Sequence, residues 1–294
     1  MNSNTIILII GATGFAGQPV ARQLQRDGYT VRILTRDRTA AVGQLGDKFT
    51  YIQGDIADEH TLQQALEGVT GVHLSLPSGH HPATLEQVQH QVAARVARLA
   101  AASGVRHVTY VSGYLVSERF VYIPAERAKL NAEIAIRTSG VPYTIFRPTY
   151  FTDMLPRFVQ GKRASIFGVQ PHAIRFLTLG DFAQMVSKAH QMPGTNRSFF
   201  VCGPEALTFE QALQTYVAKV DPGVQVSHAP FWMMRIMNRL FLRGQLTEIL
   251  QLMAATQQTG EFGTPEEAVK LFGAAQTTVA AWSAAQVSTN RTAN

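Results

Sequence analysis

Three glycines near the start of the chain constrain its fold more than any other feature. Gly11, Gly14 and Gly17 follow a short apolar run, residues 6–10, in the spacing G-x-x-G-x-x-G. The run is β-branched, continuous and too short for a helix, which predicts a buried parallel strand. A helix is predicted directly after the glycines, over residues 18–26. The first part of the chain is therefore expected to form a strand, a tight turn and a helix.

This turn has the features of a site for the pyrophosphate of a dinucleotide. Gly11 allows a tight turn, Gly14 lets the backbone approach the phosphates, and Gly17 lets the helix pack close to the strand. Free N–H groups and the positive end of the helix dipole attract phosphate. A plain strand–helix turn is the alternative, but the position of the triplet between a strand and a helix favours the cofactor site.

Strand-like and helix-like segments alternate over the first half of the chain. Further strands are predicted at residues 29–34, 49–53, 71–76, 107–111 and 143–148, with helices at 60–66, 82–102 and 126–138. Such alternation indicates an α/β fold, a doubly wound parallel sheet of Rossmann type with helices on both faces. Ligands of these sheets bind beyond the carboxyl ends of the strands.

The pattern changes near residue 150. We expect residues 1–150 to form an NAD(P)-binding domain and residues 151–294 to form a smaller, partly helical substrate-binding region. The two are interleaved, because a late strand near 198–202 has the pattern of a sheet strand. This part of the chain also contains a helix start at 264–267, where a threonine cap is followed by proline and two acids.

One segment of the second half has an unusual composition. Residues 231–243 are rich in methionine and aromatic residues and place Arg235, Arg239 and Arg243 at steps of four. We expect a flexible wall of an apolar substrate pocket, because methionine-rich surfaces adapt to varied ligands. A membrane surface and an acidic partner are the alternatives.

Composition excludes several classes of protein. There is no long uncharged apolar run, so no membrane-spanning segment is expected, and the first apolar run lacks the features of a signal peptide. The single cysteine, Cys202, leaves no internal disulfide and indicates a reducing, cytoplasmic location. The net charge of +6 has no concentrated basic arm, which favours small anionic ligands over nucleic acid. His73, His80 and His81 lack the spacing of a metal site, so no metal is expected; His80 and His81 are alternatively substrate contacts.

The residues after the second predicted strand bear on the choice of coenzyme. Arg36 lies where the ribose of a dinucleotide is recognised, and arginine suits the 2′-phosphate of NADP. Arg38 adds a second guanidinium. Asp37 supports the opposite interpretation, since a carboxylate can accept from the 2′-OH of NAD. We expect NADP(H) to be preferred, with NAD(H) as the alternative. After the third strand, Asp55 either accepts from the adenine amino group or caps the turn.

Further motifs follow in a fixed order. They are Gly54-Asp55, residues 110–113, Lys129 and residues 147–149, with 176–183 and 202–208 later in the chain. The ordered set resembles the atypical short-chain dehydrogenase/reductases, in their NmrA-like branch. The resemblance implies an NAD(P)-binding oxidoreductase. The residues expected to contact the cofactor are Gly11, Thr13, Gly14, Phe15, Gly17, Arg36, Asp55, Ile56, Leu76, Lys129 and Pro148.

The resemblance also implies catalytic roles. Ser112 is expected near the nicotinamide, and Lys129 is expected to hydrogen-bond the nicotinamide ribose. Catalytic relatives carry a general-acid tyrosine four residues before that lysine, where this chain has Ala125. The usual Ser/Tyr/Lys proton relay is therefore incomplete. Lys129 itself, Tyr114 and Tyr122 are the alternative proton donors.

Two functions follow from this departure. The first is an NADPH-dependent reductase whose substrate is a small apolar molecule, such as a quinone or an enone, that needs little acid help. The second is an NADP(H) redox sensor without turnover, which acts by binding a protein partner.

Overall fold

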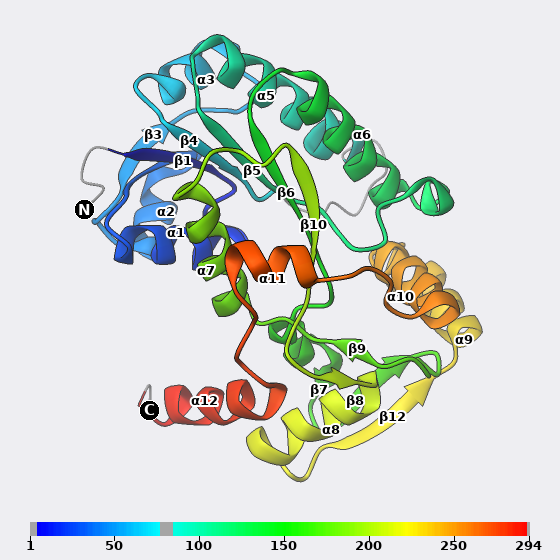
Figure 1. The fold of residues 1–294 in the computed structure, drawn as a ribbon. Helices are drawn as coiled ribbons and strands as arrows, with labels where there is room; N and C mark the ends of the chain where they lie inside the picture. The colour runs from blue at the N-terminus through cyan, green and yellow to red at the C-terminus, as the bar shows by residue number, and fades with distance from the viewer. Residues whose placement is uncertain (1–4, 77–84, 293–294) are drawn as a thin grey trace. The chain divides into compact units, whose positions relative to one another are not determined.

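The structure is a computed structural model and describes residues 5–76 and 85–292 (Figure 1). The chain forms two compact units. The first comprises the described residues of Met1–Arg147, Phe182–Phe199 and Lys270–Gly273. The second comprises those of Pro148–Asp181, Phe200–Val269 and Ala274–Asn294. His80 and His81 lie outside the described residues.

A seven-stranded sheet is the basis of the first unit. Its order is β10-β6-β5-β4-β1-β2-β3. The strands are β1 (Ile6–Ile10), β2 (Thr30–Thr35), β3 (Thr50–Gln53), β4 (Gly71–Leu74), β5 (His107–Val111), β6 (Tyr143–Pro148) and β10 (Arg197–Val201). Strands β1 to β6 pair in parallel, and the order reverses between β1 and β4. The predicted doubly wound Rossmann-type fold is thus confirmed, and the predicted late strand corresponds to β10.

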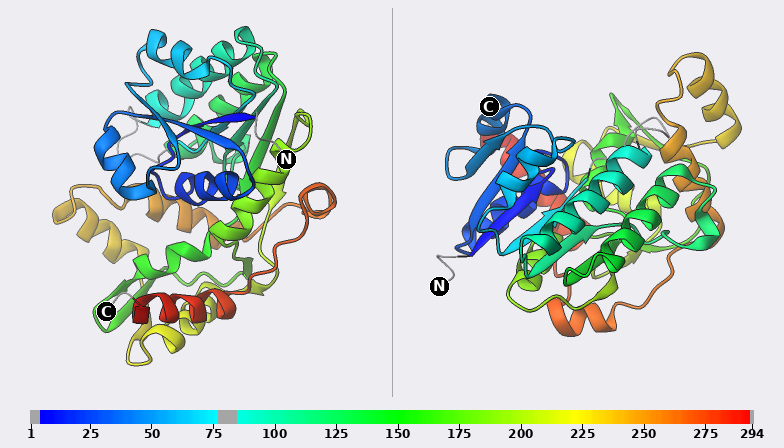
Figure 2. Two further views of the ribbon diagram at one scale, coloured as in Figure 1. Left: turned by 90° about the vertical axis from the view of Figure 1, so that its left-hand side faces the viewer. Right: turned by 90° about the horizontal axis from the view of Figure 1, so that it is seen from above.

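Helices cover both faces of this sheet (Figures 1 and 2). They are α1 (Gly17–Arg26), α2 (Arg38–Leu45), α3 (Glu59–Leu66), α5 (Val92–Ala102), α6 (Pro124–Thr138) and α7 (Leu179–His190), with the short helix α11 (Glu266–Phe272). Apolar side chains of α3, α5 and α6 pack with those of β1, β4, β5 and β6 into one buried cluster. Helices α1 and α2 lie on the opposite face.

Two helical segments differ from the prediction. No helix is predicted over Arg38–Leu45, because α2 has no apolar stripe and buries only Ala41 and Leu45. The long helix predicted at 82–102 is not uniform, since its part at Glu86–Gln91 (η1) is π-helical before α5 begins. A short 3₁₀ turn, η2 (Glu118–Phe120), precedes α6.

The second unit contains short strands and four helices among its described residues. Strands β7 (Val159–Gln160), β8 (Arg163–Phe167) and β12 (Gln225–Ala229) form one sheet, and β9 (Ile174–Arg175) pairs with β11 (Ala206–Leu207). The helices are α8 (Phe209–Val220), α9 (Phe231–Leu240), α10 (Thr247–Thr259) and α12 (Val279–Thr292), and a 3₁₀ segment, η3, spans Thr152–Phe158.

Aromatic side chains form the core of the second unit. The ring of Phe209 packs edge-on against Tyr150, Phe158 and Phe176, with centroids 4.8, 5.8 and 5.1 Å away. Such edge-to-face contacts add to the hydrophobic gain of burying the rings. Helices α8 and α12 pack side by side, as the left view of Figure 2 shows. Over the stretches 5–76 and 85–292, no helix has both the length and the apolar character needed to cross a bilayer.

Candidate coenzyme-binding and active site

In the glycine turn between β1 and α1, the positions of Gly11 and Gly17 have no room for a side chain. Gly11 has φ +84°, and a Cβ there would lie 2.0 Å from the carbonyl oxygen of Ser75. A Cβ on Gly17 would lie 2.0 Å from the carbonyl oxygen of Gly11, so α1 packs directly on the end of β1. The N–H of Gly14 donates to the same carbonyl at 3.0 Å. Each contact is with backbone, which leaves a bare main-chain surface at this strand end.

The first turn of α1 is suited to an anion. Its N-cap residue, Ala16, makes no side-chain cap bond, and the first turn contains no acidic residue. The N-terminal N–H groups of a helix lack intrahelical partners and attract negative charge. Thr13 and Phe15 are exposed on the same turn. The bare cradle and the uncapped helix end fit the pyrophosphate of a dinucleotide.

At the end of β2, an arginine and an aspartate have different surroundings. Arg36 is exposed and makes no hydrogen bond or ion pair with the residues that the structure describes. Asp37 is the N-cap of α2, and its Oδ1 accepts from the N–H of Ala40 at 2.9 Å. Arg38 begins α2 and is exposed. The carboxylate is thus engaged in capping, whereas the guanidinium of Arg36 is available to a ligand.

The predicted contacts after β3 and β4 lie at the same edge of the sheet. Asp55 is exposed, and its Oδ1 accepts from the N–H of Ala57 at 2.8 Å. It therefore caps the turn after β3, which is the second of the two roles predicted for it. Ile56 and Leu76 are partly buried and pack against the sheet core. The carbonyl of Leu76 accepts from the buried Gln89 at 3.1 Å. Because parallel strands end together, these residues and the glycine turn share one edge.

Ser112, at the end of β5, is bonded to a buried carboxylate. Its Oγ donates to Oε1 of Glu133 at 2.6 Å. Glu133 is fully buried and also accepts from Arg147, at 2.9 and 2.6 Å, and from Arg137 at 2.6 Å. Two guanidinium groups and a hydroxyl compensate the desolvated charge, as a buried carboxylate requires. Glu133 was not predicted as a site residue, because a carboxylate in a polar helix such as α6 ordinarily lies at the surface.

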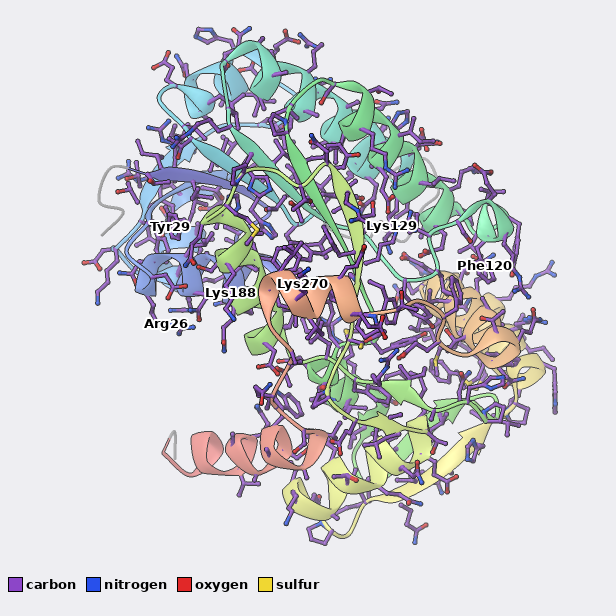
Figure 3. The ribbon with its side chains drawn as sticks, in the orientation of Figure 1. Arg26, Tyr29, Phe120, Lys129, Lys188 and Lys270 are labelled. Atoms are coloured by element: carbon purple, nitrogen blue, oxygen red, sulfur yellow. The ribbon has the colours of Figure 1, made fainter. Side chains whose placement is uncertain are left out.

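Lys129 extends from α6 toward the end of β5 (Figure 3). A Cβ on Gly113 would lie 3.6 Å from Lys129 Nζ, so the ammonium group lies beside the Ser112-Gly113 turn. Nζ forms an ion pair with Glu126 Oε1 at 3.3 Å, and the two side chains are 15% and 2% exposed. The other oxygen of Glu126 is buried and has no hydrogen-bond partner in the described part of the chain. Glu126 was also missed, although its spacing of three from Lys129 is a helix ion-pair signal.

The candidate tyrosines are in different environments. Ala125 is buried at the start of α6, so no hydroxyl is present at the position of the usual acid. Tyr114 follows the Ser112 turn with its ring buried, and Tyr122 is 60% exposed. Pro148 is buried at the end of β6. Among the candidate proton donors, Lys129 places its charged group beside the Ser112-Gly113 turn.

Two other features of the sequence are accounted for by burial. His73 is fully buried, with Nδ1 2.8 Å from Thr109 Oγ1. Cys202 follows β10 and is buried, and this burial raises the pKa of its thiol to about 11. In the described stretches of the chain, His, Cys, Asp and Glu side chains form no group of three that is suited to a metal ion.

Comparisons with known proteins identify the family to which the chain belongs. The NAD(P)H-binding family model matches residues 11–164. A Streptomyces griseus protein named (4-alkanoyl-5-oxo-2,5-dihydrofuran-3-yl)methyl phosphate reductase is 33% identical over 211 residues, which are 69% of this chain and 70% of that protein. The photosystem II assembly factor Ycf39 of Trieres chinensis is 26% identical over 245 residues, 80% of this chain and 75% of that protein.

Two further matches bear on the type of protein and on the fold. An NmrA-like family domain-containing oxidoreductase of Aspergillus japonicus is 30% identical over 174 residues, 56% of this chain and 52% of that protein. The crystal structure of Citrobacter sp. triphenylmethane reductase with NADP(H) superposes with a TM-score of 0.77 at 21% identity, covering 96% of this chain and all of that one. The resemblance stated from the motifs is therefore confirmed: the chain belongs to the NAD(P)H-binding family of Rossmann-type oxidoreductases, and it is NmrA-like.

Proposed function

We propose that the protein is an NADPH-dependent reductase of a small apolar acceptor with a polarised conjugated double bond, a quinone or an enone. The observation that carries the proposal is the Lys129–Glu126 pair. It lies beside the Ser112-Gly113 turn, while Ala125 occupies the position of the usual tyrosine. The site thus has a charged proton source and no tyrosine at the position of the usual acid.

The preference for NADPH rests on Arg36 and Asp37. A planar, permanently charged guanidinium without a protein partner suits the 2′-phosphate. The neighbouring carboxylate caps α2 through Oδ1, so this oxygen is engaged and does not compete for a ribose hydroxyl. The glycine turn and the uncapped end of α1 are proposed to hold the pyrophosphate, with Thr13 and Phe15 flanking it.

The residues present favour a conjugated acceptor over a simple ketone. When bound, NADPH supplies a hydride. Lys129 Nζ–H is proposed to hold the proton that completes the reduction, and Glu126 keeps this ammonium group charged and oriented. A simple ketone develops its negative charge on one oxygen and benefits most from a nearby acid. A quinone or an enone spreads that charge by conjugation. Its reduction therefore needs less help from an acid, and we propose that Lys129 is a sufficient proton source without the usual tyrosine.

One relative supports this choice of acceptor. The name of the Streptomyces griseus reductase contains a 5-oxo-2,5-dihydrofuran, a ring with a carbon–carbon double bond beside a carbonyl group. That protein is similar to this chain over more than two thirds of both. We propose that this protein also reduces a carbon–carbon double bond beside a carbonyl group, and we do not assign the particular compound.

The test is NADPH oxidation with a panel of quinones, enones and simple ketones. We expect turnover with members of the first two groups and none with ketones. Lys129→Arg retains the positive charge but does not release its proton at neutral pH. This variant should bind NADPH within about threefold of wild type and lose about 100-fold or more in turnover, the usual contribution of a positioned acid. Unchanged turnover would exclude Lys129 as the proton donor.

A second function is favoured by one observation, the buried Ala125 at the position of the usual acid. We propose as the alternative a sensor that binds NADP(H) without turnover and acts through a protein partner. The relative named as an assembly factor is consistent with such a role. Saturable NADPH binding with no oxidation by any acceptor of the panel would favour this alternative.

A further inference from the structure

Helix α9 exposes two rows of side chains that are adjacent on its surface. Trp232, Ile236 and Leu240 are spaced by four residues and form an apolar row. A second row, called here the arginine row, consists of Arg235, Arg239 and Arg243, the last of which lies in the turn after the helix. Residues four apart share a helix face, and the spacing of three between Trp232 and Arg235, repeated at Ile236 and Arg239, places the rows next to each other.

The apolar row does not belong to the core of the second unit. Trp232, Ile236 and Leu240 are 66%, 51% and 66% exposed, and Phe241 beside them is 75% exposed. The opposite face of α9 faces the protein, where Met234 packs with residues of α10 and its surroundings. The exposed row is thus apolar surface that is not packed into the core of the second unit.

The arginine row has no acidic residue within its own segment of the chain. The segment from Phe231 to Thr247 contains no aspartate or glutamate. Arg235 lies over the ring of Phe231, 6.0 Å from its centroid. No guanidinium of the row forms an ion pair or hydrogen bond with any residue in the described part of the chain. All three line a shallow hollow of about 590 Å³ between α9 and α10. The three positive charges around this hollow repel one another, and a bound anion would offset that repulsion.

The turn after α9 is held in a strained conformation that completes this row. Arg243 has φ +49°, a left-handed conformation that is unfavourable for a residue with a Cβ. The buried Asn238 fixes the turn: its Oδ1 accepts from Leu246 N–H at 2.8 Å and its Nδ2 donates to Thr247 Oγ1 at 3.0 Å. Its carbonyl accepts from Gly244 N–H at 2.9 Å. Strain of this kind is retained where the surroundings impose it, often at functional positions.

We propose that α9 and its following turn bind the surface of an anionic lipid bilayer. The arginine row contacts the phosphate groups of the lipid heads, and Trp232, Ile236, Leu240 and Phe241 enter the boundary between heads and acyl chains. Basic residues beside tryptophan and large aliphatic side chains are typical of helices that lie in this boundary. A free phosphate ester would satisfy the arginine row and leave the apolar row in water. The lipid surface is the ligand that uses both rows, and it does not depend on the proposed reductase activity.

The test is binding of the full chain to lipid vesicles. Trp282→Phe leaves Trp232 as the only tryptophan, so a blue shift of its emission reports entry into the boundary. We expect the shift and co-sedimentation with vesicles of phosphatidylcholine and phosphatidylglycerol, and neither with phosphatidylcholine alone. Each arginine near an anionic surface contributes about fivefold to binding. The triple variant Arg235→Gln, Arg239→Gln, Arg243→Gln should therefore bind about 100-fold more weakly.

A matched variant separates this site from general charge. Arg26→Gln, Arg106→Gln and Arg119→Gln together remove the same charge from exposed positions of the first unit and should leave vesicle binding within about threefold. Leu240→Asn should weaken binding without loss of charge. Equal binding by the two triple variants would overturn the proposal. Tighter binding of glycerol phosphate than of vesicles would assign the row to a free phosphate ester. Tighter binding of a polyglutamate peptide would assign it to an acidic protein.

Discussion

At the residue scale, the contrast between Arg36 and Asp37 leads to a prediction about the coenzyme. Arg36→Gln removes a guanidinium that has no protein partner, so the fold should be unaffected. Charge-assisted bonds to a phosphate contribute about 1.5–3 kcal/mol. We expect NADPH affinity to fall about 10- to 100-fold and NADH affinity to change less than about threefold, as measured by calorimetry. Arg106→Gln, at an exposed arginine just before β5 and outside the coenzyme site, is the control. Equal losses for the two coenzymes would exclude recognition of the 2′-phosphate by Arg36.

The predicted residues of the site differ in how well a sequence reveals them. Those at strand ends, from Gly11 to Ser112, are predictable because parallel strands bring their carboxyl ends to one edge. Glu126 and Glu133 are not, because a carboxylate in a polar helix ordinarily faces water. The packing of α6 on the sheet buries both carboxylates. It also brings them next to the cations that pair with them, which are Lys129, Arg137 and Arg147. That burial depends on tertiary structure, and the spacing of three between Glu126 and Lys129 predicts their ion pair but not its burial.

At the element scale, the junction of β1 and α1 depends on Gly17. A Cβ at this position would lie 2.0 Å from the carbonyl oxygen of Gly11, and backbone cannot move aside as a side chain can. Gly17→Ala should therefore displace α1 from β1, lower the free energy of unfolding by about 1–3 kcal/mol, and weaken NADPH binding at least tenfold. Urea unfolding and calorimetry measure the two effects.

A second glycine provides the control for that substitution. Gly43 lies inside α2 and has nothing within 4 Å of a built Cβ. Gly43→Ala should raise the free energy of unfolding by about 0.5–1 kcal/mol, because alanine is the better helix former. Its NADPH affinity should equal that of wild type. If Gly17→Ala behaved like Gly43→Ala, the close approach of α1 to β1 would not be required for the site.

The same physical factors explain which elements the sequence predicts. β1, β5 and β6 match their predicted bounds, because β-branched and aromatic residues predominate in them, and such residues favour strands. Helix α2 lacks the apolar periodicity on which such predictions depend. Strands β7, β9 and β11 have two residues each, too few for any alternation to appear. Their pairing is determined by the tertiary packing of the second unit.

At the scale of the whole molecule, a buried histidine cluster in the first unit should govern the acid limit of stability. His73 and His190 approach Thr109 Oγ1 at 2.8 and 3.1 Å, and the rings of His107 and His190 are 5.1 Å apart. Burial lowers the pKa of His73 to about 3 and that of His107 to about 4. Burial, followed by its two histidine neighbours, lowers the pKa of His190 well below its usual value. All three are therefore neutral in the folded protein at neutral pH.

These shifts predict how stability depends on pH. In the unfolded chain the same histidines have a pKa near 6.5, so below that pH the unfolded state binds protons that the folded state does not. Stability should be constant above about pH 7 and fall as the pH decreases from about 6.5 toward 4, by up to about 1.4 kcal/mol per pH unit for each histidine. Urea unfolding at pH 7.5, 6.5, 5.5 and 5.0 measures this slope before most carboxylates titrate. His73→Gln should reduce the slope by about a third, whereas His60→Gln, at an exposed position, should leave it unchanged. A slope that is identical in wild type and His73→Gln would show that the buried cluster does not set the acid limit.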